Sequence, residues 1–308
     1  MVKLPHTTLT RRAFLATGAS AFVASRAGAA NLLVDRASPR IAAIDWAPPR
    51  IAAIDWAMAE TAMALGLPLA ALAEKRQFVR GAAITLPDAC ADLGLRGAPN
   101  LEALSLVSPD LILSSNFYSF VEPQLERIAP VYTRSLFVAG EPALPKVLLA
   151  MEALADHLDL RAQGQETRAH FETEFDHLAE RVSAFADRPF VLMTVGDARH
   201  IQVFGADSIY GGALARIGLT NAWAGGTEFG FNAPVPVSKL LAFPDAHLVL
   251  VGDVPQNAQR AIRQGALWSA LAPVRAGRLL SLSDNNPFGG APSALRFADH
   301  LVTALERA

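Results

Sequence analysis

The sequence predicts an α/β protein of two lobes joined by a single long helix, with a ligand cleft between the lobes. Three observations support this: apolar segments alternate with helical segments, both halves of the chain repeat one order of elements, and a long amphipathic segment separates them. Fully apolar strands that alternate with helices are typical of buried parallel sheets. We therefore place an N-terminal α/β lobe at 49–141, a connecting helix at 142–162 and a C-terminal α/β lobe at 163–308.

The first thirty residues have the pattern of an export signal. An arginine pair at 11–12 precedes an apolar run over 13–25, and small residues at 27–29 offer a cleavage site. This pattern describes a secretory signal, and the arginine pair points to the twin-arginine route. The run is too short to span a bilayer, which needs about 20 apolar residues. We expect the protein to leave the cytoplasm already folded and residues 1–29 to be removed; the alternative is an ordinary amphipathic helix.

Composition restricts the possible partners. Removing residues 1–29 takes four basic residues and no acid from a chain with 27 basic and 29 acidic residues, which changes the formal charge from −2 to −6. This mild acidity argues against nucleic acid as a partner. Cys90 is the only cysteine, so no intrachain disulfide is possible. It lies far from the cleavage site, so we expect an inert buried thiol and a protein without a lipid anchor.

A tandem repeat occupies residues 39–57. The nine residues 39–47 recur as 49–57 after one proline, and each copy contains a short strand bounded by prolines. Only the second copy continues directly into a helical pattern, so we take Arg50–Trp56 as the first strand. Residues 30–48 are then an N-terminal extension, whose copy of the strand either pairs at a sheet edge or stays loose.

The two lobes show the same local order. In each, a short helix leads through a Pro-Asp turn into a fully apolar strand, at 100–113 and at 238–250. Each lobe then has a helix that ends in Ala-Pro and enters another strand, at 127–131 and at 270–274. The repetition predicts two parallel sheets, one in each lobe.

The segment between the lobes contains few turn residues. Apolar residues recur at helical spacing from Leu144 to Leu158, Gly164 interrupts the pattern, and a second amphipathic stretch begins at Phe171. At about 1.5 Å per residue, the first helix is long enough to join two lobes as a stiff strut. The alternative is a two-helix hairpin within one domain.

Motifs of enzymes and metal sites are scarce. The chain has no G-x-S-x-G elbow, no phosphate-binding loop and no H-E-x-x-H. His170 and His177 lie seven residues apart on a helix, where we expect them to be solvated. Without paired His or Cys ligands, the sequence predicts neither a metal site nor an enzyme.

Polar and aromatic residues follow the predicted strands, where open α/β sheets bind ligands. Trp56, Arg96 and Tyr118 end three segments of the first lobe and should converge on one side. In the second lobe, loops at 229–232 and 285–290 mix aromatic and turn-forming residues. An arginine, a phenol and several rings suit a ligand with anionic oxygens and apolar bulk. The alternatives are that Arg96 caps a helix or pairs with a nearby aspartate, and that any one ring belongs to the core.

Several segments resemble the class III substrate-binding proteins of ATP-driven importers, of the periplasmic ferric-hydroxamate type. The resemblance covers essentially the whole mature chain, and its specificity comes from the order and spacing of the segments. The segments are 50–56, 94–102, 126–130, 203–205, 221–223 and 293–297. It implies two α/β lobes joined by one long helix, with the ligand in a shallow cleft. We expect such a cleft to move little on binding, because one stiff helix hinges poorly compared with several flexible strands.

The resemblance also implies roles for single residues. Arg96 and Tyr118 match the arginine and tyrosine that hydrogen-bond the hydroxamate oxygens in that family. Fewer large aromatic residues stand at the positions that form the aromatic wall of the cleft in that family, which implies a thinner wall in this chain. The residues at the wall positions are Trp56, Phe78, Phe231 (or Gly230), Asn286 and Phe288.

Family members present one carboxylate per lobe to arginines of the membrane permease. In this chain Pro123 occupies the first-lobe position and Glu122 lies beside it, so Glu122 is the expected docking residue. Ser238 occupies the second-lobe position, which therefore lacks a carboxylate.

The function implied by the resemblance is that of a monomeric periplasmic receptor. It would capture a ferric siderophore and deliver it to an inner-membrane ABC importer. Iron stays inside the siderophore, so no cofactor is expected. The alternatives are a class III protein for another iron chelate, haem or cobalamin, and an exported α/β enzyme. A ferric catecholate complex is strongly anionic, so its site would need several arginines. The first lobe offers only Arg96 and Arg80, which argues against a catecholate ligand.

Overall fold

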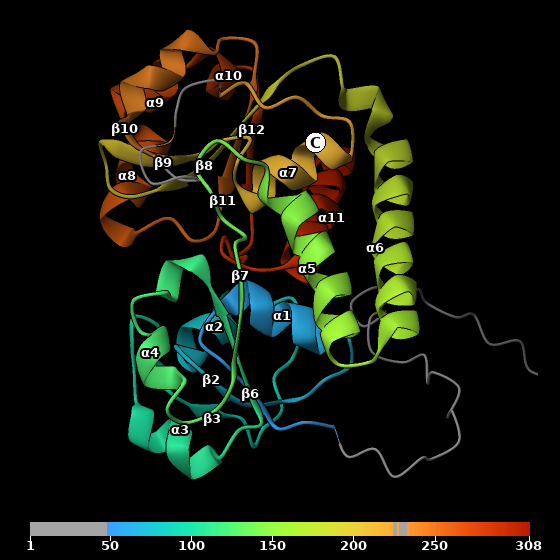
Figure 1. Ribbon diagram of the computed structural model, residues 1–308. Helices are drawn as coiled ribbons and strands as arrows, with labels where there is room; N and C mark the ends of the chain where they lie inside the picture. Colours follow the sequence, from blue (N-terminus) through green and yellow to red (C-terminus); the bar gives the residue numbers. More distant parts are fainter. Residues whose placement is uncertain (1–47, 224–226, 228–232) are drawn as a thin grey trace, which may run out of the picture. The chain divides into compact units, whose positions relative to one another are not determined.

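The computed structural model describes residues 48–223, 227 and 233–308, and residues 48–308 form one compact unit (Figure 1). Two five-stranded sheets lie within it, each covered by helices on both faces. The fold is therefore of the α/β class. The export signal, the first copy of the repeat and Phe231 with Gly230 all lie outside the described residues.

The first sheet is parallel throughout, as predicted. Its order is β3 (Ala91–Asp92), β2 (Leu69–Leu72), β1 (Ile51–Ala53), β6 (Leu111–Ser115) and β7 (Val131–Arg134). The central strand β1 comes from the second copy of the repeat. A two-stranded hairpin, β4 (Gly94–Leu95) and β5 (Ala98–Pro99), follows β3 and carries Arg96 at its turn.

Alternate residues of the first sheet face two helical layers. Ile51 and Ala53 pack in the cluster that contains α1, while Ala52 and Ile54 pack against the opposite layer. The helices of this lobe are α1 (Trp56–Ala64), α2 (Lys75–Gly81), α3 (Leu101–Val107), η1 (Asn116–Tyr118, a 3-10 helix) and α4 (Glu122–Leu125). Because β1 is covered on both faces, its residues are apolar without alternation.

Two side chains fix the start of helices in this lobe. Asp55 accepts the backbone N–H of Met58 at 2.9 Å and begins α1, and Asn100 accepts that of Ala103 at 2.9 Å and begins α3. Such N-caps satisfy donors that the first turn leaves free. Trp56 is consequently the first residue of a helix and not the last of a strand.

The second sheet is mixed, which corrects the prediction of a parallel sheet. Its order is β10 (Ala233–Pro236), β9 (His200–Phe204), β8 (Phe190–Val195), β11 (His247–Val251) and β12 (Leu279–Leu282). Only β8, β11 and β12 run parallel. β9 returns antiparallel to β8 because just four residues connect them, whereas a parallel crossover needs a dozen or more. Asp197 stabilises that turn by accepting the N–H groups of Arg199 and His200.

The second Ala-Pro pair also differs from expectation. Pro273 lies in the first turn of a helix, where its missing N–H costs no hydrogen bond, and β12 begins only at Leu279. Pro130, by contrast, directly precedes β7. The helices of this lobe are η2 (Ser183–Phe185), α7 (Ile209–Arg216), η3 (Val237–Ala242), α8 (Gln256–Gln264), α9 (Ala266–Ala270), α10 (Ala272–Arg275) and α11 (Ala291–Arg307).

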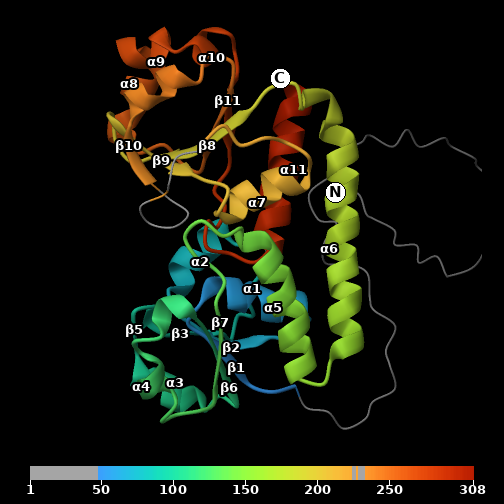
Figure 2. The same ribbon diagram turned by 45° about the horizontal axis from the view of Figure 1, so that its top comes forward.

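Two antiparallel helices, α5 (Ala143–His157) and α6 (Arg161–Val182), occupy the place of the helix predicted over 142–162 (Figures 1 and 2). The chain turns at Asp159, whose φ of 58° is left-handed. Gly164 does not interrupt a helix. It lies inside α6, where a Cβ would come within 2.5 Å of the Ala155 Cβ, so glycine allows the two helices to cross closely.

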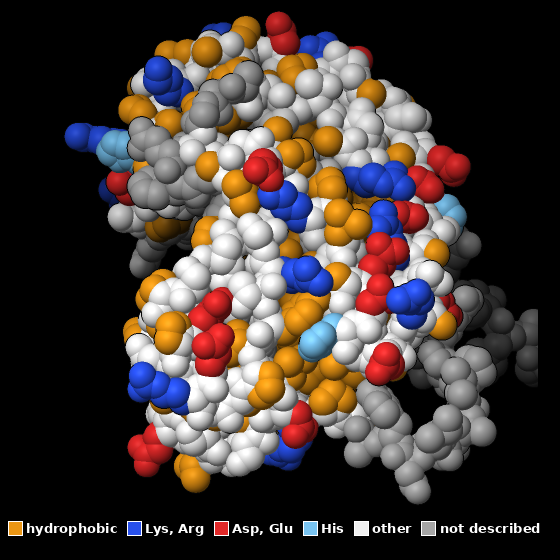
Figure 3. Space-filling model, in the orientation of Figure 1, with side chains coloured by type: hydrophobic (Ala, Val, Ile, Leu, Met, Phe, Trp, Pro, Cys, Tyr) orange, Lys and Arg blue, Asp and Glu red, His pale blue; other side chains and the backbone are white. Residues whose placement is uncertain are grey.

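The long helix α6 joins the two lobes. Near its start, the side-chain amide of Gln163 donates to the carbonyl of Leu65 in the first lobe. Near its end, Arg181 donates to the Glu306 carboxylate on α11 in the second lobe at 2.8 Å. Acidic and basic side chains are interspersed over its outer face (Figure 3). Arg168 and Glu172 of this helix form an ion pair at 2.9 Å. His170 and His177 are exposed on this helix, as predicted.

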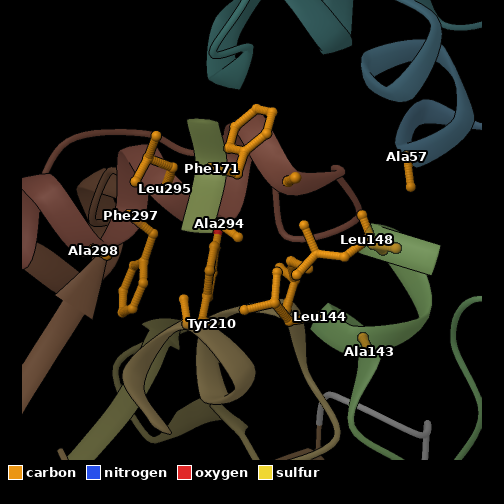
Figure 4. Packing of buried hydrophobic residues seen from close by; sticks show 14 of the residues in the cluster. Ala57, Ala143, Leu144, Leu148, Phe171, Tyr210, Ala294, Leu295, Phe297 and Ala298 are labelled. Atoms are coloured by element: carbon orange, nitrogen blue, oxygen red, sulfur yellow. The ribbon is translucent and has the colours of Figure 1, made fainter. Parts of the chain in front are cut away.

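One apolar core continues from the first sheet to the second. It collects side chains of α1, α5, α6, α7 and α11 together with the facing residues of both sheets. In Figure 4 the ring of Tyr210 on α7 lies beside that of Phe297 on α11, with centroids 4.6 Å apart. Leu144 of α5 packs closely on α7: a Cβ added at Gly212 would lie 2.8 Å from the Cβ of Leu144. The lobes are thus held by packed side chains. No helix among the described residues is long and apolar enough to cross a membrane.

Candidate ligand-binding site

Three predicted residues meet at the carboxyl edge of the first sheet. Arg96 comes from the turn of the β4–β5 hairpin, Trp56 begins α1 after β1, and Tyr118 ends η1 after β6. The guanidinium carbon of Arg96 lies 3.8 Å from the centroid of the Trp56 ring. The phenol of Tyr118 is a hydrogen-bond partner of the same guanidinium. The predicted convergence of these strand ends is confirmed.

Aromatic rings hold the guanidinium from both lobes. Trp56 is fixed by its indole N–H, which donates to the carbonyl of Ala73 at 3.0 Å. Phe78 packs edge-on against Trp56 at 5.8 Å and is fully buried, so it supports Trp56 from behind. On the other side, the ring of Phe288 from the second lobe lies 5.3 Å from the Arg96 guanidinium. Arg96 therefore sits where the two lobes meet.

Glu74 is a site residue that the sequence reasoning missed. Its Oε2 accepts the Nε–H of Arg96 at 2.8 Å, with side-chain exposures of 16% for Arg96 and 24% for Glu74. The acid that pairs with Arg96 is thus not Asp92, whose carboxylate accepts the backbone N–H of Gly94. A signal existed: Glu74 follows β2, so it occupies the same strand-end position as the recognised residues.

A buried carboxyl lies beneath the site. Asp55 accepts the Ser115 hydroxyl at 2.8 Å in addition to its capping bond to α1. Burial raises the pKa of Asp55 above its ordinary value, although these hydrogen bonds and the charge of Arg96 act in the opposite direction. Burial likewise raises the pKa of the Tyr118 phenol. Tyr118 is therefore a neutral O–H donor at physiological pH.

The side chain of Asn286 serves its own loop. Its Oδ1 accepts the backbone N–H of Phe288 at 3.1 Å, and its amide nitrogen lies 3.4 Å from the carboxylate of Glu60. Glu60, on α1, also accepts the N–H of Gly290 at 2.8 Å and the hydroxyl of Ser293 at 2.6 Å. These bonds fix the loop that presents Phe288. A lone acid in the otherwise apolar first turns of α1 was the signal for this buried network.

A small pocket of about 130 Å³ opens beside these residues. Both lobes line it, with Trp56, Gln77, Phe78, Arg80 and Gly81 from the first and Asp284, Asn285, Asn286 and Pro287 from the second. A row of rings continues from its neighbourhood: Phe117 stacks on Phe137 at 5.7 Å, and Phe137 meets Phe288 at 6.4 Å. These rings provide apolar surface in addition to the predicted aromatic positions.

The expected docking residue has a hydrogen-bond partner of its own. Glu122 is the first residue of α4 and accepts the hydroxyl of Thr133 at 2.5 Å. Ser238, at the corresponding place in the second lobe, is exposed. The docking role of Glu122 stays a prediction.

Metal-binding groups are absent from the part of the chain described. Within residues 48–223, 227 and 233–308, no group of three or more His, Cys, Asp or Glu side chains could hold a metal ion. Cys90 is free and buried, and burial raises the pKa of its thiol to about 11, as expected for an unreactive residue.

The fold and the site define a class of protein. Two α/β lobes, a long joining helix and a polar and aromatic site at the junction are the class III substrate-binding architecture. The model of the periplasmic binding protein family matches residues 51–285, and the chain belongs to this family. The iron(3+)-hydroxamate-binding protein FhuD of Escherichia coli (strain K12) is 31% identical over 220 residues, which are 71% of this chain and 74% of that protein.

Solved structures share the fold. The siderophore-binding protein FhuD from Vibrio cholerae, bound to Fe³⁺–Desferal, has a TM-score of 0.77 at 22% identity, over 84% of this chain and 98% of that one. The petrobactin-binding protein YclQ from Bacillus subtilis has a TM-score of 0.68 at 17% identity, over 85% and 93% of the two chains. At such identities the likeness concerns the fold.

Proposed function

We propose that this chain is a periplasmic receptor that captures a ferric hydroxamate siderophore and delivers it to an inner-membrane ABC importer. The observation that carries the proposal is the Arg96 guanidinium, stacked on Trp56 and partnered by Tyr118 at the junction of the lobes. The 31% identity to a protein named as iron(3+)-hydroxamate-binding supports the same ligand class. Iron would remain inside the siderophore, so the protein would supply no metal ligand.

The site offers two kinds of donor to hydroxamate oxygens. Arg96 donates its Nε–H to Glu74 and also contacts the Tyr118 phenol, and the remaining N–H groups of its guanidinium can donate to a ligand. Tyr118 contributes a neutral phenol. Each hydrogen bond to a charged partner contributes roughly 1.5–3 kcal/mol. The rings of Trp56 and Phe288 would cover the apolar part of the ligand.

The remaining parts of the proposal concern delivery. We infer export through the twin-arginine signal, action as a monomer, and docking of the permease against Glu122. The continuous apolar core between the lobes supports a cleft that closes little around its ligand, because packed side chains resist hinge motion.

The experiment that tests this function is a titration of the purified mature protein, followed by intrinsic fluorescence. The panel is a set of ferric hydroxamates, a ferric catecholate, haem and cobalamin. Saturable binding of the hydroxamates with the highest affinity supports the proposal. A preference for catecholate, haem or cobalamin would reassign the ligand within the class, and the absence of all binding would reject the receptor function.

A further inference from the structure

We propose that Glu74 is a specificity-determining residue, which makes the site select ferric complexes without net negative charge. The proposal rests on the function proposed above and concerns the same site. Its starting observation is that the arginine of the site is already paired: Glu74 Oε2 lies 2.8 Å from Arg96 Nε, and Oε1 lies 3.4 Å from the Arg96 backbone nitrogen.

The backbone around Glu74 holds this acid in place. Glu74 has a φ of 52°, a left-handed conformation that non-glycine residues rarely adopt. Its N–H donates to the carbonyl of Gly94 at 2.6 Å, which ties it to the hairpin that carries Arg96. Its own carbonyl accepts the N–H groups of Gln77 and Phe78 in α2. The two partners are therefore positioned by the same local structure.

The pairing changes the charge that a ligand meets. Arg96 alone would offer a positive charge in a partly buried site, but the carboxylate of Glu74 balances it. Asp55, beneath them, adds no positive charge, and Lys75 next in sequence directs its ammonium to the carbonyl of Cys90. The neighbouring pocket is lined by one basic residue, Arg80, and one acidic residue, Asp284, so it adds no net charge either.

Such a site provides directed donors without a net positive field. A ferric tris-hydroxamate core is uncharged, because three hydroxamate anions balance Fe³⁺, whereas a tris-catecholate carries three negative charges. The first needs hydrogen bonds to its polarised oxygens, which Arg96 can donate while paired. The second needs compensating positive charge, which Glu74 removes. The carboxylate of Glu74 therefore disfavours a ligand more strongly with each negative charge that the ligand carries.

The test uses ligands that share one iron-binding core and differ in charge. Ferric desferrioxamine B carries +1, its N-acetyl form 0 and its N-succinyl form −1. Affinities are measured at low salt for the wild-type chain and for Glu74→Gln, which keeps an acceptor for Arg96 but removes the charge. Glu126→Gln, an exposed acid of the same lobe, is the matched control.

We expect Glu74→Gln to improve the affinity for the −1 ligand relative to the +1 ligand by about tenfold, two units of ligand charge at about threefold each after screening. Glu126→Gln should leave the ratio within about twofold. An equal loss for all three ligands would overturn the proposal, because Glu74 would then only position Arg96. An unchanged ratio would overturn it as well. Failure of the wild-type chain to bind any of the three would instead reject the proposed function.

A second substitution guards against a folding defect. Asn tolerates the left-handed conformation better than Gln, so Glu74→Asn removes the same charge at a compatible residue. Both variants should melt cooperatively and show the same shift in the ligand ratio. A shift in only one of them would contradict a charge effect.

Discussion

The carboxyl group of Glu60 on α1 accepts the hydroxyl of Ser293 on α11 at 2.6 Å, and so links the two lobes through a buried acidic side chain. The same carboxylate accepts the backbone N–H groups of Gly290 and Ser293, at the beginning of α11. A carboxylate at a helix N-terminus satisfies donors that have no partner inside the helix and interacts favourably with the helix dipole. Glu60 therefore caps a helix of the other lobe and fixes the loop that carries Phe288.

Glu60→Ala should lower the free energy of unfolding by about 3 kcal/mol or more, because several buried donors would lose their acceptor. Urea denaturation followed by circular dichroism measures the change. Glu166→Ala is a suitable control, since Glu166 is an exposed acid on α6. If the two variants lose similar stability, Glu60 does not hold the lobes together.

The pH dependence of stability tests the same residue. Burial raises the pKa of Glu60 above its ordinary value of 4.5, so its contribution is fully present below pH 4.5 and is lost as pH rises through the folded-state pKa. The stability of the wild-type chain relative to Glu60→Gln should therefore fall as the pH rises above 4.5. A difference that stays constant, or grows with pH, would contradict this assignment. The pKa of Asp55 is also raised, but Asp55 is present in both proteins, so its effect cancels in the comparison.

Gly164→Ala should lower the melting temperature. In an open helix this change would stabilise by about 1 kcal/mol, but the new Cβ would lie 2.5 Å from the Ala155 Cβ. The double variant with Ala155→Gly restores the space and should regain much of the loss, so the two effects should not add. Additive losses in thermal melts would show that the helices do not cross at these residues.

The thiol of Cys90 should resist modification in the folded protein. Burial raises its pKa to about 11 from an ordinary value of 9.0, which lowers the thiolate fraction about 100-fold near neutral pH. A disulfide reagent at pH 8 should react at least that much faster with urea-unfolded protein. Comparable rates in the two states would mean that Cys90 is accessible.

Much of the site was predictable because it follows a local rule. Trp56, Arg96 and Tyr118 each follow a strand, and carboxyl ends of parallel strands share one edge of a sheet. Glu74 obeys the same rule but stands next to Lys75 in a charged stretch, which resembles an ordinary helix start. Its pairing with Arg96 depends on the left-handed backbone of Glu74 itself, a conformation that the sequence does not predict because the residue is not a glycine.

Other features depend on contacts between distant segments. The partners of Glu60 lie more than 220 residues further along the chain, so a sequence read locally shows only an isolated acid in a helix. The turn at Asp159 contains neither Gly nor Pro, and the nearby Gly164 was read as the helix break. The prediction of a helix break at Gly164 is wrong, because the glycine lies inside α6 and allows α5 and α6 to cross closely.

The central claim is that Arg96 binds the ligand, and equilibrium titration of Arg96→Ala with a ferric tris-hydroxamate tests it most directly. Arg127→Ala, an exposed arginine of the same lobe, serves as the control. The affinity of Arg96→Ala should fall by at least about tenfold, as the loss of one charged hydrogen bond implies, while Arg127→Ala should bind like the wild-type chain. An unchanged affinity in Arg96→Ala, in a protein that melts like the wild type, would contradict the site.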